Sequence, residues 1–323
     1  MNASRVTEIA NAILYEGYIL YPYRASAMKN RQRFNFGVVV PQAYCNAGGS
    51  GEISSLRTEC LVRGDAAARL TVRIRFLHLM SRTIEPAEPG VPGEWQEASE
   101  RDVGLHAVLG ELSADPVQRG FHFFAQRLVH PAGASLTVRT QHALTGEVEV
   151  TGHQVRDSVF RVRVRVSNTT ALARGEPCDR DDLLMRALVS THAILQIEGG
   201  EFLSLLDPPG GFEELAESCS QAGLFPVLAG EASDRDAMLA SPIILYDYPQ
   251  VAPESAGDFF DGTEIDEMLA LRVLTMTDGE KAEMRQVDDH ARQILERTER
   301  LSALDLMNLH GTLRNPRAKD ADR

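Results

Sequence analysis

The sequence predicts an α+β protein that is mostly β, with an antiparallel, sandwich-like β body and a helical C-terminal tail. Apolar and polar residues alternate in several short segments between residues 50 and 166, which is typical of strands with one face in a core and one in water. Polar turn residues separate these segments, as in β-sandwiches. Helix-start signals replace the alternation after residue 262. We therefore expect a β-rich body with short helices over residues 1–250, and an extended acidic arm with a helical tail over residues 251–323.

Four segments show the alternation most clearly: Leu70–Leu77, Leu136–Gln141, Glu147–Thr151 and Val159–Val166. The connection GHQVRDS (152–158) between the last two is short, which predicts that they form a hairpin.

The arginines Arg161, Arg163 and Arg165 share the outer face of the last of these strands and have two interpretations. They stand about 6.6–7 Å apart along the strand, which would suit a ladder that binds an anion or a polymer. Alternatively, Glu147 and Glu149 of the hairpin partner form cross-strand ion pairs with them. We favour the ion pairs, because exposed charge runs are usually solvated faces.

Residues 178–257 predict short elements. Acidic residues from Asp179 to Asp182 suit the first turn of a short helix, and a second short helix is expected over Phe212–Ser220. The segment HAILQIEGGEFLSLLD (192–207) predicts a hairpin that turns at Gly199-Gly200. The segment 241–257 contains three prolines and predicts a buried strand that leaves into an extended arm.

Three helices are predicted in the tail, and they begin at the capping residues Thr263, Thr277 and Ser302. Thr277 and Glu280 form a capping box, and their helix should reach about Leu301. The last helix should end near Gly311. Since the tail differs in character from the body, we expect a fragment ending at Ala256 to keep a folded β body.

The charge distribution argues against several classes of partner. The net charge is −13, and residues 201–267 hold 15 acidic side chains and one basic one. A field of this sign repels nucleic acids and anionic membranes. No apolar run is long enough for a membrane span, and the N-terminus lacks a secretory pattern. We therefore expect a cytoplasmic protein whose four cysteines are reduced, without a disulfide.

A basic segment with aromatic residues lies near the N-terminus, where residues 17–51 contain no acidic side chain. Its interaction residues are predicted to be Tyr21, Tyr23, Arg24, Lys29, Arg31 and Arg33. Such a segment can bind nucleic acid or nucleotides, but the acidic excess of the chain argues against nucleic acid. We predict instead that it docks on the acidic block between Glu201 and Glu267, within one chain or between two copies. Arg31 and Arg33 should then form ion pairs with carboxylates of that block.

The acidic arm is the third candidate surface. In SAGDFFDGTEIDEM (255–268), Asp258, Asp261 and Glu264 are close in sequence, and paired carboxylates can bind a hard cation or act as acid and base. The order lacks the spacing of a calcium loop, and the carboxylates also suit a helix start. We therefore predict no metal site, and we assign these three residues to an interaction surface.

No motif in the sequence indicates catalysis. It contains no phosphate-binding loop, dinucleotide fingerprint, zinc-protease helix or nucleophile elbow. The spacing of the histidines does not predict a metal site. We assign no catalytic residue and no cofactor.

Three segments carry a resemblance to a known family: ILYEGYILYPYRASAMKNRQRFNFGVV (13–39), EGGEFLSLLDPP (198–209) and SPIILYDYPQVAPESAGDFFDGTEIDEMLALRVLTMTDGEKAEM (241–284). They resemble an uncharacterised family of bacterial proteins that is associated with [NiFe]-hydrogenase gene clusters. The resemblance implies an assembly role beside a redox enzyme, and it carries over no catalytic residue.

Together these observations predict a non-enzymatic accessory or assembly protein that docks a partner protein, such as a [NiFe] hydrogenase. Two alternatives stay open. One is a metal- or carboxylate-dependent enzyme, and the other is a small-molecule binding module that uses the concave face of the sandwich. The sequence also allows a homo-oligomer.

Overall fold

A computed structural model describes residues 3–24, 27, 30, 33–48, 51–86, 94–133, 135–172, 179–250, 266–302 and 305–306. Its strands are β1 (Ser55–Glu85), β2 (Glu94–Val108), β3 (Val117–Phe123), β4 (Gln126–Ala132), β5 (Ser135–Gln141), β6 (Leu144–Arg156), β7 (Val159–Asn168), β8 (Val189–Leu203), β9 (Phe225–Leu228) and β10 (Ala237–Ser241). Its helices are α1 (Ala3–Tyr15), α2 (Gln42–Asn46), α3 (Arg180–Leu184), α4 (Glu213–Glu217), α5 (Asp266–Leu274), α6 (Asp278–Val287) and α7 (Asp289–Glu299).

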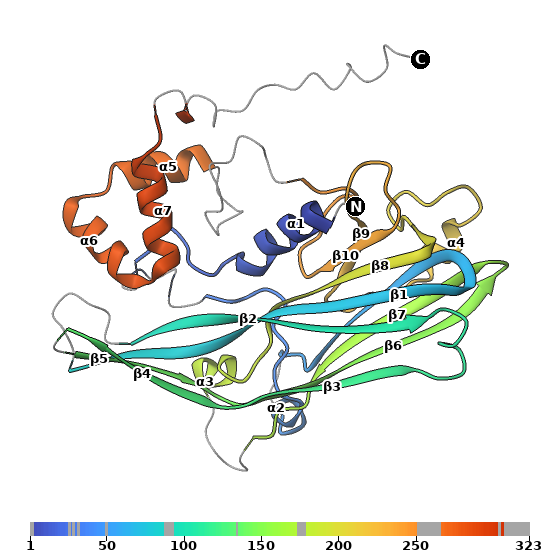
Figure 1. Ribbon diagram of the computed structural model, residues 1–323, viewed down its shortest axis with the longest axis horizontal. Helices are drawn as coiled ribbons and strands as arrows, with labels where there is room; N and C mark the ends of the chain where they lie inside the picture. The colour runs from blue at the N-terminus through green and yellow to red at the C-terminus, as the bar shows by residue number, and fades with distance from the viewer. Residues whose placement is uncertain are drawn as a thin grey trace.

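The strands form one antiparallel sheet organised around β1, which is 31 residues long. The path through the sheet is β3-β6-β7-β1-β8-β10-β9, while β2 and β5 also pair with β1 and β4 pairs with β5. The first part of β1 pairs with β7, and the later part pairs with β2. Figure 1 shows β1, β2 and β8 lying over β3, β6 and β7. The predicted antiparallel, sandwich-like body is therefore confirmed.

The main core lies between these layers. Strand alternation turns apolar side chains from every layer into it, among them Val72 and Ile74 of β1, Val148 of β6 and Val162 and Val164 of β7. All of the four predicted strand segments lie within β1, β5, β6 and β7, and β6 and β7 form the predicted hairpin. Local period-2 patterns were sufficient to locate them.

A second core joins the helical tail to the body. Leu269 of α5 and Ile294 of α7 pack in one cluster with Leu77 and Leu79 of β1 and with Trp95 of β2. The three tail helices lie together beside that end of the sheet (Figure 1). The tail follows the β-rich part in sequence, as predicted. It also completes the second core of the body.

Helix α1 covers a third, smaller cluster. Val6, Ala10 and Ile13 project from one face of α1 and pack on Ile194 of β8 and Leu239 of β10. The spacing of three and four residues along α1 is that of one helical face.

Strand β8 is continuous where the sequence predicted a hairpin turning at Gly199-Gly200, so this prediction was wrong. The pairing of β1 with β8 shifts register between Gly64 and Arg69, opposite these glycines. A Cβ on Gly200 would lie 2.8 Å from the Arg63 carbonyl oxygen. The glycines therefore allow two backbones to approach closely at a bulge.

Two boundaries also differ from the prediction. The helix expected from Thr277 to about Leu301 is divided at Asp288 into α6 and α7. The Thr277 capping box is present, and Asp288 caps α7 by accepting a 2.8 Å hydrogen bond from the Ala291 amide. The sequence predicted a buried strand that begins at residue 241. The strand at this place is β10, and it ends at Ser241. The short helices α3 and α4 lie where they were predicted, and Gly311 lies outside the described residues.

Among the described residues, no helix has the length and apolar composition that a membrane crossing requires.

Candidate functional site: an arginine-lined hollow

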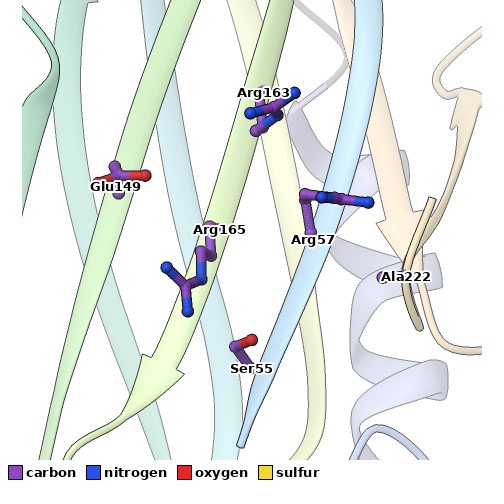
Figure 2. Close-up of a pocket in the computed structure, with 6 residues that line it drawn as sticks. All are labelled: Ser55, Arg57, Glu149, Arg163, Arg165 and Ala222. Carbon is purple, nitrogen blue, oxygen red and sulfur yellow. The ribbon is translucent and has the colours of Figure 1, made fainter. Parts of the chain in front are cut away.

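A hollow of about 340 Å³ lies on the outer face of β6, β7 and the first part of β1. We call it the arginine hollow, and its lining residues are Ser55, Arg57, Glu149, Arg163, Arg165 and Ala222 (Figure 2). Alternation explains why these side chains meet, because the residues between them on β1, β6 and β7 point into the main core. Three arginines and one glutamate therefore face the same open space.

Arg57 and Arg165 are directly opposite each other in the β1–β7 ladder. Like charges in this position are destabilising. The guanidinium of Arg57 donates a 2.7 Å hydrogen bond from Nη2 to Ser220 Oγ, and its buried Nε has no partner. Within the described part of the chain, the Arg165 side chain forms no ion pair or hydrogen bond, and the Arg57 side chain forms no ion pair. Two adjacent cations thus lack an acidic partner.

The one lining glutamate forms no ion pair with either arginine. Glu149 is opposite Arg165 in the β6–β7 ladder, but its carboxylate accepts a 2.8 Å hydrogen bond from Gln118 Nε2 of β3. Figure 2 shows the Arg165 guanidinium directed away from Glu149.

Arg163, by contrast, is fixed by an ion pair. Its Nη2 lies 2.6 Å from Glu59 Oε1, and the Glu59 side chain is 3% exposed. Burial raises the pKa of Glu59, but hydrogen bonds from the Ser220 amide and from Arg163 outweigh it and hold the pKa below its usual value. The Glu59 carboxylate is therefore ionised and compensates Arg163.

This arrangement can bind an anion. Guanidinium groups present several N–H donors in a plane that matches carboxylates and phosphates. The lining contains no histidine or cysteine. Across the described residues, no group of three or more His, Cys, Asp or Glu side chains could hold a metal ion.

The sequence predicted that Glu147 and Glu149 pair with the arginines of β7. This was wrong, because Arg163 pairs with Glu59 of β1, and Arg161 donates to Ser218 Oγ. Arg57 and Glu59 were missed. Ser55, Arg57 and Glu59 do alternate with Leu56, Thr58 and Cys60, but only the pairing of β1 with β7 brings that face beside the β7 arginines.

The predicted N-terminal interaction residues lie mostly against the tail helices. Tyr23 is fully buried, and Tyr21 makes an edge contact with it, with 6.1 Å between ring centroids. The Arg272 guanidinium of α5 lies 5.3 Å from the Tyr21 ring centroid. Arg24 forms ion pairs of 3.3 and 3.7 Å with Glu280 and Glu283 of α6. This segment therefore does meet acidic residues, but they lie beyond the block that ends at residue 267.

Arg33 does not form the ion pair expected with residues 201–267. It is 5% exposed, and its guanidinium donates 2.9 Å hydrogen bonds to the carbonyl oxygens of Tyr18 and Gln96. It also lies 3.7 Å from the Trp95 ring centroid. Burial lowers its pKa to about 10. The aromatic residues near Arg33 form a cation–π site inside the second core. They do not form the predicted interaction surface for acidic side chains.

The other predicted interaction residues, Lys29, Arg31, Asp258, Asp261 and Glu264, lie outside the described residues. Cys45, Cys60 and Cys219 are free thiols, and Cys178 also lies outside that part.

No protein-family model matches the chain, and no curated protein is similar to it.

Proposed function

We propose that the chain is a non-enzymatic accessory protein that docks a partner protein in the cytoplasm, and that an acidic segment of this partner enters the arginine hollow. The observation that carries the proposal is the pair Arg57 and Arg165, directly opposite each other and without an acidic partner in the described residues. An incoming carboxylate would relieve the repulsion between them and form charge-assisted hydrogen bonds.

The lining favours a charged group of a larger partner over a small apolar ligand. Pockets for small molecules are mostly apolar and have volumes of about 300–1,000 Å³. The arginine hollow lies near the lower limit of that range, and only Ala222 contributes an apolar side chain. The family resemblance suggests that the partner is a redox enzyme subunit such as a [NiFe] hydrogenase.

The proposal is tested by fluorescence anisotropy with a labelled decapeptide of alternating Glu and Gly and with its Gln counterpart. We expect the Glu peptide alone to bind, with an affinity that falls as salt rises. Arg57→Gln and Arg165→Gln should each weaken binding about two- to five-fold. Arg127→Gln on β4, outside the lining of the hollow, is the matched control and should leave binding unchanged. Equal binding of both peptides, or equal loss in all three variants, would contradict the proposal.

A further inference from the structure

A second hollow of about 270 Å³ continues the first along β7. Its lining includes Glu59, Thr151, His153, Arg161 and Arg163, so Arg163 belongs to both hollows. The two hollows therefore follow one strand, with Arg165 towards one end, Arg161 towards the other and Arg163 between them.

The charge along this groove is not uniform. At one end, Arg165 and Arg57 lack acidic partners in the described residues. In the middle, Arg163 is compensated by Glu59. At the other end, Arg161 donates to the neutral Ser218 hydroxyl, its buried Nε has no partner, and it forms no ion pair with any described residue. Glu59 lowers the positive potential near Arg161, but its carboxylate accepts its hydrogen bonds from Arg163 and from the Ser220 amide.

The two ends that lack an ion pair with a described residue are four residues apart on β7, which corresponds to about 13 Å along an extended strand. Carboxylates at positions i and i+4 of an extended peptide have the same separation and project from the same face. A carboxylate at i+2 would instead meet the compensated Arg163 beside Glu59.

We infer that the groove selects an extended acidic segment whose carboxylates are four residues apart, with an uncharged residue midway between them. This inference rests on the proposed function and adds a spacing rule to it. The ligand class is therefore a peptide with Glu or Asp at i and i+4, lying along β7 from Arg165 to Arg161.

The test compares three labelled nonapeptides of identical composition, each with two Glu residues in a Gly/Ser/Gln background. The Glu residues stand at positions 3 and 7, 3 and 5, or 3 and 4. Fluorescence anisotropy should show that the 3/7 peptide binds about two- to five-fold more tightly than the 3/5 peptide. In Arg161→Gln, all three peptides should still bind, but weakly and without this preference. Arg127→Gln should leave the preference intact.

The outcomes separate the two claims. Equal affinities for the three peptides, with loss in Arg165→Gln, would overturn the spacing rule and leave the proposed function standing. Tightest binding of the 3/5 or 3/4 peptide would also overturn the rule. No binding of any peptide would overturn both. Urea unfolding of each variant shows whether a loss of binding reflects a loss of folded protein.

Discussion

The indole nitrogen of Trp95 donates a 3.0 Å hydrogen bond to Asp288 Oδ2 and so joins β2 to the start of α7. Asp288 accepts a second hydrogen bond from the Ala291 amide and caps the helix. The face of the Trp95 ring is covered by the Arg33 guanidinium. One buried indole therefore connects the N-terminal segment, the sheet and the helical tail.

We predict that Asp288→Ala lowers the free energy of unfolding by about 2–3 kcal/mol, because it removes a helix cap and leaves a buried indole donor unpaired. Trp95 is the only tryptophan, so its fluorescence reports this contact directly and should shift to longer wavelength. The matched control is Asp289→Ala, whose side chain is 80% exposed; it should cost less than about 1 kcal/mol. Similar losses in both variants would contradict the assigned role of Asp288.

A fragment ending at Ala256 tests how the two cores divide the stability. The buried residues of the main core lie between Val39 and Ala240, and Tyr248, which packs against them, also precedes Ala256. We therefore expect the fragment to keep a cooperative β-type transition in circular dichroism. Its melting temperature should fall and Trp95 should become exposed, since the second core loses α5, α6 and α7. Loss of all cooperativity would show that the tail is required for the whole fold, and unchanged Trp95 emission would contradict the shared core.

Two buried histidines predict a loss of stability in acid. Burial lowers the pKa of both His78 and His192 to about 4. The folded-state pKa of each histidine lies below the unfolded value of about 6.5. Their contribution to the free energy of unfolding is therefore present above pH 6.5 and is lost as the pH falls towards 4. Urea unfolding from pH 7 to pH 4 should show a smaller decline for His192→Gln than for the parent, by about 2–3 kcal/mol at pH 4. If the decline for His192→Gln equals that of the parent, the buried neutral imidazole is ruled out.

Glu59→Gln should change both stability and ligand preference. The substitution leaves Arg163 without its carboxylate, so we expect the free energy of unfolding to fall by about 1–3 kcal/mol. The same change adds an uncompensated cation midway along the groove. Binding of the nonapeptide with Glu at positions 3 and 5 should therefore strengthen relative to the 3/7 peptide. Anisotropy titrations measure the ratio, and an unchanged ratio would show that Glu59 does not set the spacing.

Much of the fold was predictable because its signals are local. The alternation of Val159–Val166 and the short connection to β6 predicted the hairpin, and the Thr277–Glu280 pair marked the start of α6. The Gly199-Gly200 pair led to the wrong prediction of a hairpin turn, since a turn and a bulge both need residues that tolerate unusual backbone angles. Only the distant partner strand, at Gly64, distinguishes the two.

The site was less predictable than the fold. The β7 arginines were visible as a ladder, but the like-charge pair exists only because β1 and β7 place Arg57 opposite Arg165, and no local pattern sets that register. The basic N-terminal segment looked like a surface, yet Arg33 is buried among aromatic rings. Guanidinium groups bury more readily against aromatic faces than their charge suggests, and composition alone does not report this.

The most direct test of partner docking through the arginine hollow is the Arg165→Glu variant, measured for both acidic-peptide affinity and unfolding free energy. The substitution replaces a like-charge pair with an opposite-charge pair across β1 and β7, but it also places a carboxylate opposite Glu149 across β6 and β7. Because these two effects offset each other, the free energy of unfolding should change by less than about 1 kcal/mol. The affinity for the alternating Glu/Gly decapeptide should fall at least about five-fold. A fall in binding without a fall in stability would identify Arg165 as a binding residue. Unchanged peptide affinity in the folded variant would contradict the account.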